Sequence, residues 1–314
     1  MTPAISIKNV HKIYEKKGSH SARHESLDSG THALKDFSLE INSGEFFALL
    51  GPNGGGKSTL INIIAGPTKK TSGTIKIFGL DIDTHREDTK FMIGVVPQEV
   101  NFDSFFNVNE VLTFCSGYYG IKNNQNYIDE ILEKLNLEDK KYANTRALSG
   151  GMKRRLLIAK ALVHKPKVLI LDEPTAGVDV ELRHNLWVYM RELNKAGLTI
   201  LLTTHYLEEA ESLCKRTAII NKGTVVALDE TKKLIKSLGN YKEMTLNFKD
   251  KIGKIPAHLE QFKAKKISDY DLVLTFEPKE LNKVLTALKD LDPSDIELQS
   301  QSLEDVFLKL TYRS

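Results

Sequence analysis

This sequence has few cysteines, a small net charge and no long apolar run, and each of these features excludes a class of protein. Only two cysteines, Cys115 and Cys214, occur in 314 residues, and their spacing fits neither a disulfide framework nor a metal motif. The 44 basic and 41 acidic residues leave a net charge of +3, so no broad basic field favours nucleic acid. We therefore expect a reducing cytosolic environment and no nucleic-acid partner.

Segments that would span or cross a membrane are missing as well. Nowhere do about 18 apolar residues run together, and residues 1–7 lack the basic and apolar regions of a signal peptide. Hydrophobic residues nevertheless make up 41% of the chain, which is enough for the core of one large or two modest domains. We expect a folded protein whose membrane role, if it has one, comes through a partner.

The most informative stretch is residues 51–59, which satisfies the phosphate-loop pattern G-x-x-x-x-G-K-[ST] and adds a second hydroxyl. Residues 45–50 before it read as an apolar strand and residues 60–65 after it as a buried helix, as a phosphate loop requires. Glycine lets backbone N–H groups turn toward anionic oxygens, and the helix start adds a positive dipole end. A glycine-rich turn without a ligand is the alternative. The cradle is formed by Gly51, Pro52, Asn53, Gly54, Gly55, Gly56, Lys57, Ser58 and Thr59.

Three side chains of this loop predict a magnesium nucleotide as the ligand. Lys57 would reach the β- and γ-phosphates, and the Ser58 hydroxyl would ligate Mg²⁺. Thr59 would hydrogen-bond an α-phosphate oxygen.

Two later apolar segments end in residues suited to phosphate chemistry. Residues 168–171 lead into Asp172 and Glu173, and residues 198–204 lead into His205. Because the carboxyl ends of parallel strands meet at one sheet edge, we expect these groups to lie together. Asp172 would bind Mg²⁺ and Glu173 would polarise the attacking water. The acids could instead cap the next helix, and His205 could be an ordinary surface residue.

Two further elements lie between the phosphate loop and the acids. Gln98 closes a strand-like segment over residues 93–98, although a lone glutamine there could be a simple cap. Residues 148–152 read Leu-Ser-Gly-Gly-Met and lead into a helix-forming stretch, so a second helix start able to bind an anion is predicted.

Together these motifs resemble the nucleotide-binding subunits of ATP-binding-cassette (ABC) transporters over about residues 4–235. In that family's terms, residues 51–59 are the Walker A loop and residues 148–152 the signature motif. The single-residue motifs are the Q-loop Gln98, the Walker B Asp172, the catalytic Glu173, the D-loop Asp179 and the switch His205.

The resemblance implies ATP and Mg²⁺ as cofactors and assigns roles beyond the phosphate loop. It implies catalytic roles for Glu173, His205, Gln98 and Lys57, and magnesium contacts for Ser58, Gln98 and Asp172. Nucleotide contacts outside the loop fall on Tyr14, which would stack on adenine, and on Ser149, Gly150, Gly151 and Asp179.

The resemblance also has departures. Gly55 stands where the family usually has alanine, Met152 where glutamine is commonest, and a long polar loop follows Tyr14. The donors that hold phosphate are kept, so nucleotide binding should survive. The variant Leu-Ser-Gly-Gly-Met-Lys-Arg-Arg-Leu looks like the ABC-2-type exporter ATPases, which serve drug, polysaccharide or lipid export.

The implied fold is an α/β P-loop NTPase of the ABC type, with a mostly parallel core sheet, an antiparallel β flap and a helical insert. We expect this domain over residues 1–238, with the insert at about 99–163 and a polar loop at 16–33. Residues 239–314 should form a small accessory α/β domain. Its predicted strands are 244–248, 271–276 and 296–300, and its helices are 278–291 and 303–310, the last with a capping box from Ser302 to Asp305.

Two stretches leave alternatives open. His20, His24 and His32 recur at multiples of four and would share a helix face able to bind metal, but a solvated loop explains the same composition. The aromatic residues between 102 and 120 would most simply form the core of the insert. Some of them could instead line an exposed groove for a partner helix.

The predicted function is an ATP-hydrolysing motor of an ABC-2-type exporter. It would dimerise with a second copy on ATP and drive export through a separate ABC-2-type permease, attached to the cytoplasmic face of the inner (plasma) membrane. A soluble ABC-type ATPase of translation or DNA maintenance is the alternative, as is a binder without turnover. The chain has one cassette, no sustained heptads before the signature and both Glu173 and His205, which favours the motor.

Overall fold

The computed structural model describes residues 2–15, 30–237, 239, 241–289 and 291–312. The described chain forms two compact units, divided between Thr231 and Lys232. The sequence suggested residue 238 instead. The division therefore assigns almost all of α8 (Thr231–Ser237) to the second unit.

The antiparallel flap predicted before the phosphate loop is confirmed. It is a four-stranded sheet in the order β2-β1-β4-β5, comprising β1 (Ile5–Tyr14), β2 (Thr31–Ile41), β4 (Ser72–Ile77) and β5 (Leu80–Asp81). Apolar residues at alternate positions of these strands are buried, as one covered face of a sheet requires.

The predicted polar loop 16–33 ends earlier than expected. Residues 31–33 belong to β2, because Thr31 pairs with Tyr14 and His32 with Ile13 across the ladder. His32 is thus an exposed strand residue, whereas His20 and His24 lie outside the described residues. Across the residues that the structure describes, no group of three metal-binding side chains occurs.

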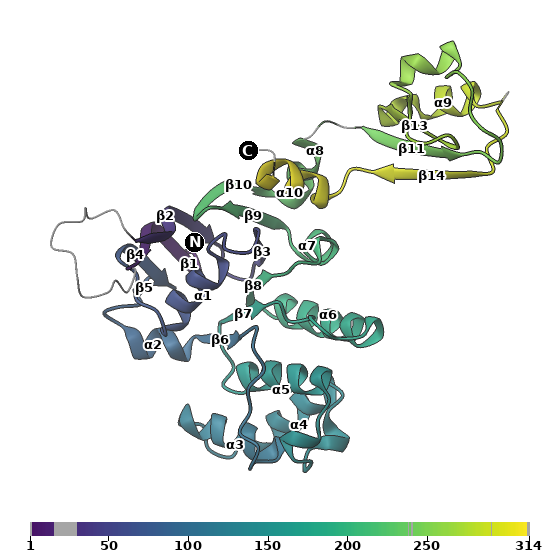
Figure 1. Ribbon diagram of the computed structural model, residues 1–314. Helices are drawn as coiled ribbons and strands as arrows, with labels where there is room; N and C mark the ends of the chain where they lie inside the picture. Colours follow the sequence, from purple (N-terminus) through teal and green to yellow (C-terminus); the bar gives the residue numbers. More distant parts are fainter. Residues whose placement is uncertain (1, 16–29, 238, 240, 290, 313–314) are drawn as a thin grey trace, which may run out of the picture. The chain divides into compact units, whose positions relative to one another are not determined.

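The core sheet has six strands in the order β10-β9-β3-β8-β7-β6 (Figure 1). The strands are β3 (Phe46–Leu50), β6 (Ile93–Val96), β7 (Val168–Asp172), β8 (Thr199–Thr203), β9 (Arg216–Asn221) and β10 (Thr224–Glu230). All neighbours are parallel except β10, which is antiparallel to β9. Every residue of β3, β7 and β8 is buried, which explains why these strands read as unbroken apolar runs.

Helices cover the core sheet and form the insert. One face of the sheet packs against the flap and α1 (Lys57–Ala65) in a single apolar cluster. The other helices of this unit are α2 (Arg86–Phe91), α3 (Val108–Tyr118), α4 (Gln125–Lys134), α5 (Gly150–Leu162), α6 (Val180–Lys195) and α7 (Leu207–Leu213). Helices α3, α4 and α5 contact one another, so the predicted helical insert is present (Figure 1).

The second unit is a four-stranded antiparallel sheet in the order β12-β13-β11-β14. Its elements are β11 (Lys242–Asn247), β12 (Lys265–Lys266), β13 (Asp271–Phe276), β14 (Asp295–Ser300), α9 (Leu281–Ala287) and α10 (Leu303–Tyr312). The helix expected over 278–291 is a 3₁₀ turn (Pro278–Glu280) followed by the shorter α9. The capping box is confirmed, because the Ser302 amide donates to Asp305 Oδ2 at 2.9 Å and the Asp305 amide donates to Ser302 Oγ at 3.4 Å.

Among the helices that the structure describes, none is long and apolar enough to cross a membrane.

Candidate active site

The phosphate loop joins the end of β3 to the start of α1, as its sequence context predicted. Gly56 precedes the helix with a φ of 110°, and a Cβ there would lie 2.7 Å from the Ala33 carbonyl oxygen. A side chain at this position would be strained twice, by the positive φ and by the close backbone. At Gly55, a Cβ would lie 2.9 Å from the Pro52 oxygen. The Gly55 N–H donates to that same oxygen at 3.0 Å and so closes a tight turn. Glycine in place of the family's usual alanine therefore suits this position.

Lys57 is buried and lies over its own loop. Its Nζ donates to the Gly51 oxygen at 2.6 Å and to the Pro52 oxygen at 3.2 Å. Burial lowers the pKa of Lys57, and the negative charges of Glu173 and Asp172 oppose that effect. A partly desolvated ammonium favours a strongly anionic ligand such as a phosphate chain.

The carboxyl ends of β7 and β8 bring the predicted acidic residues to one edge. Asp172 pairs in register with Thr203, whose hydroxyl donates to Asp172 Oδ1 at 2.5 Å. Glu173 follows with a φ of 51°, a sparsely populated conformation for a residue with a side chain. Its amide donates to the Thr203 oxygen at 3.0 Å. From this turn after β7, the Glu173 carboxylate contacts Gln98, which follows β6, and His205, which follows β8.

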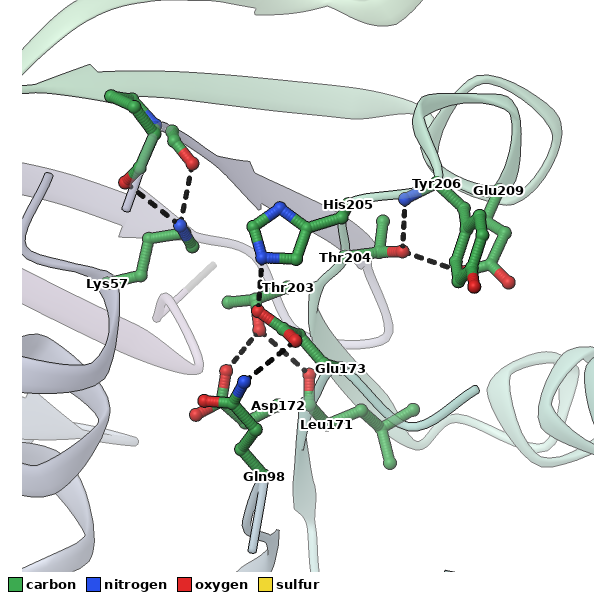
Figure 2. A network of polar contacts seen from close by, with 12 residues as sticks. Lys57, Gln98, Leu171, Asp172, Glu173, Thr203, Thr204, His205, Tyr206 and Glu209 are labelled. Atoms are coloured by element: carbon green, nitrogen blue, oxygen red, sulfur yellow. Dashed lines mark hydrogen bonds and ion pairs between the residues drawn. The ribbon is translucent and has the colours of Figure 1, made fainter. Parts of the chain in front are cut away.

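Glu173 is the centre of the site, because two predicted residues bond to its two oxygens (Figure 2). Gln98 Nε2 donates to Oε2 at 2.9 Å, and His205 Nε2 lies 2.6 Å from Oε1. The Glu173 side chain is 13% exposed and that of His205 is 48% exposed, so the cluster is partly open to solvent. Gln98, which the sequence also allowed as a simple cap, and His205, which it also allowed as an ordinary surface residue, both contact Glu173.

The remaining predicted residues lie at helix starts and strand ends. Ser149 is the N-cap of α5, where its Oγ accepts from the Met152 amide at 3.3 Å, and a Cβ at Gly150 or Gly151 would meet no atom within 4 Å. Asp179 caps α6 by accepting from the Leu182 amide at 2.9 Å. Tyr14 ends β1 with a ring that is 40% exposed and has Lys12 Nζ 4.6 Å from its centre.

Arg154 contacts the segment that carries Gln98, and the sequence did not single it out. Its guanidinium is buried and donates to the carbonyl oxygens of Pro97 and Gln98 at 2.6 and 2.7 Å. Because Arg154 belongs to α5, it joins the helix that Ser149 begins to the segment that carries Gln98. In the sequence it is the middle of three consecutive basic residues, and nothing in residue type marks it as buried.

A groove lies beside this segment, away from the Glu173 cluster. It consists of a cavity of about 550 Å³ and an adjoining one of about 440 Å³, which share five lining residues. These are Asn101, Cys115, Tyr118, Tyr119 and Lys160.

The interpretation of the aromatic residues as the insert's own core is wrong for Phe105, Phe114 and Tyr118, which are 82%, 57% and 79% exposed. The capping box of Asn107 and Glu110 fixes the start of α3. Residues 108, 112 and 116, spaced by four, then face inward. Phe114 and Tyr118 also differ by four but lie half a turn away, so they face outward.

Comparisons with known proteins agree with this geometry. A family model described as "ABC transporter" matches residues 34–176. Nod factor export ATP-binding protein I of Cupriavidus metallidurans is 36% identical, over 100% of this chain and 99% of the relative. The protein of the same name in Mesorhizobium japonicum is 36% identical, over 89% of this chain and 82% of the relative.

Solved structures similar to this chain are also ATP-binding proteins of the ABC type. An ATP-binding subunit of an ABC transporter has 26% identity and a TM-score of 0.66, covering 75% of this chain and 93% of that one. A dimeric ATP-binding cassette in a post-hydrolysis state, bound to ADP and phosphate, has 27% identity and a TM-score of 0.63. That match covers 72% of this chain and 98% of the cassette.

Proposed function

The chain belongs to the ATP-binding subunits of ABC transporters, and on that premise we propose that it drives export through a separate ABC-2-type permease. It binds and hydrolyses ATP, as its family does. The observation that supports the motor role most strongly is the bonding of Glu173 to both Gln98 and His205 beside the phosphate loop. The relatives are export proteins, which disfavours the alternative of a soluble ATPase in translation or DNA maintenance.

The residues around Glu173 and in the phosphate loop would each have a separate role in ATP hydrolysis. Glu173, at the strand end, would orient the attacking water and accept its proton. His205 and Gln98 hold the two oxygens of that carboxylate. Lys57 would stabilise charge on the β- and γ-phosphates, with Thr59 on the α-phosphate. Tyr14 would stack on adenine with the face that Lys12 leaves free.

The donor set at this edge fits Mg²⁺. Asp172 offers a carboxylate, Ser58 an exposed hydroxyl at the start of α1, and Gln98 an amide oxygen, because its nitrogen is the atom bonded to Glu173. Oxygen donors of this kind are the ligands that Mg²⁺ prefers. When bound, the ion would neutralise charge that develops on the phosphate oxygens.

Removing Mg²⁺ with a chelator is therefore expected to lower phosphate release by about 100-fold or more, with full recovery when excess Mg²⁺ is added back. The matched variant Asp172→Asn should need a higher Mg²⁺ concentration for half-maximal rate, because it loses one charged oxygen ligand. Phosphate release is measured against free Mg²⁺ for both proteins. Turnover at the full rate without a divalent ion would contradict these assignments.

The groove beside Gln98 is the proposed contact with the permease. A short helix from the cytoplasmic side of an ABC-2-type permease would place apolar side chains on Phe114 and Tyr118, which line the groove, and on Phe105, which adjoins the lining residue Phe106 in the chain. The exposure of Phe105, Phe114 and Tyr118 is unusual for large apolar groups. Arg154 and Gln98 lie between this groove and Glu173, so nucleotide state and permease position can affect each other there. Through this contact the chain would attach to the cytoplasmic face of the inner membrane.

Changing Phe105 to glutamate should release the permease while ATP binding stays within about twofold of the parent, because a charge would enter the apolar contact. Co-purification from detergent-solubilised membranes measures the release. Phe106→Glu should act in the same direction, although Phe106 also packs on Phe114 at 4.9 Å between ring centres. Tyr142→Glu is the control, since Tyr142 is 74% exposed but neither lines the groove, as Phe106 does, nor adjoins a lining residue in the chain, as Phe105 does. Full retention of the permease by both phenylalanine variants would refute this contact.

A further inference from the structure

Glu209 is a buried carboxylate that the catalytic roles above do not use. It lies in the first turn of α7, only 6% exposed, and four side chains surround it. Thr175 Oγ1 and Trp187 Nε1 donate to its Oε1 at 2.8 and 3.3 Å, and Thr204 Oγ1 donates to its Oε2 at 2.7 Å. Arg183 Nε lies 3.8 Å from Oε1 and supplies the positive charge that a buried carboxylate requires.

The two threonines are the important partners, because of their places in the chain. Thr175 comes two residues after Glu173, and Thr204 comes directly before His205. One carboxylate thus holds the segment that carries the catalytic base and the segment that carries the histidine, one on each oxygen. Thr204 Oγ1 also accepts from the Tyr206 amide at 2.9 Å, so the backbone on both sides of His205 is fixed (Figure 2).

The contact between Glu173 and His205 depends on these anchors. His205 is 48% exposed, so burial alone does not fix its ring within 2.6 Å of Glu173. Glu173 itself sits in a strained turn, which persists only when neighbouring structure holds it. The bonds from Glu209 are buried and charge-assisted, the kind that holds a geometry most firmly.

We propose that Glu209 is a positioning residue of ATP hydrolysis, which sets the distance between Glu173 and His205 by holding Thr175 and Thr204. It touches neither the nucleotide loop nor the reacting atoms. The proposal rests on the proposed function, since it assumes that Glu173 and His205 act on ATP.

The test compares Glu209→Ala with Glu209→Gln and with the control Glu208→Ala, which removes an exposed carboxylate from the same helix turn. Glu209→Ala should lower kcat about 10- to 100-fold while the Kd for ATP stays within about threefold. Glu209→Gln keeps an oxygen for Thr175 and Trp187 and an amide for Thr204, so it should return to within about fivefold of the parent. Glu208→Ala should match the parent.

A second measurement separates positioning from general destabilisation. In a His205→Ala background, Glu209→Ala should cost less than about threefold in kcat, because the distance that it sets no longer matters. Equal losses in both backgrounds, or a kcat for Glu209→Ala within about twofold of the parent, would overturn the proposal. If Glu209→Ala does not fold, the isosteric pair Thr175→Val and Thr204→Val gives the same comparison. An active parent and an inactive Glu173→Gln variant test independently the part of the proposed function on which this inference rests, namely that Glu173 acts on ATP.

Discussion

Replacing Glu173 with glutamine is expected to leave ATP binding intact and to lower steady-state hydrolysis by about 100-fold or more. Glutamine has the same shape and can still accept the bond from Gln98, but its amide cannot take a proton from water. General-base catalysis contributes about 10²- to 10⁴-fold to such reactions, so the loss should be large. Glu173 follows β7 and is not part of the phosphate loop, so the change removes none of the loop's donors and binding should survive.

Two measurements on the same preparation check this result: the Kd for a fluorescent ATP analogue, and the rate of phosphate release at saturating ATP. The matched control is Glu192→Gln, which removes a carboxylate from an exposed ion pair with Lys134. A single exposed pair contributes about 1 kcal/mol or less, so this control should keep the parent rate. Hydrolysis by Glu173→Gln near the parent rate would remove Glu173 from the role of base.

Local patterns were enough to predict the centre of the site. The phosphate loop is a continuous motif whose glycines, lysine and hydroxyls each have a fixed task, and its strand and helix follow from the neighbouring residues. Asp172, Glu173 and His205 could be brought together from sequence alone, because parallel strands end at a common edge.

The residues that the sequence did not reveal are buried polar groups whose partners are distant in the chain. Arg154 bonds to carbonyls more than 50 residues away, and Glu209 bonds to Thr175 34 residues away. Arg154 stands between two other basic residues and Glu209 beside the exposed Glu208, so residue type and periodicity could not separate them. The outward face of α3 could be given only as an alternative, since a helix that is apolar on two sides does not show which side is covered.

A second large effect is expected when two inactive variants are mixed. Lys57→Ala removes the ammonium over the phosphate loop, and Ser149→Arg removes the N-cap of α5 and fills the open space at its start. If ATP lies between the phosphate loop of one copy and the α5 start of the other, a mixed dimer has one site with both lesions and one intact site. Two helix starts acting on one phosphate chain supply more stabilisation than either alone, which makes ATP part of the interface.

A shared site predicts what fraction of the parent ATPase rate the mixture recovers. Random mixing at equal ratio produces mixed dimers for about half of the population, each with one intact site of two, so about a quarter of the parent rate should return. Mixing the parent with Lys57→Ala is the control, because it shows whether a dimer with one intact site turns over alone. Light scattering verifies that mixed dimers form, with the permease present if isolated subunits associate weakly.

The central claim, that two copies of this chain share each ATP site, is tested most directly by the ATPase rate as a function of the mixing ratio of Lys57→Ala and Ser149→Arg subunits. Sharing predicts a curve that rises from background to a maximum at equal ratio and falls again. If each copy carried a complete site of its own, every site in the mixture would keep one lesion. A flat line at background across all ratios, with the control active and mixed dimers present, would contradict the claim.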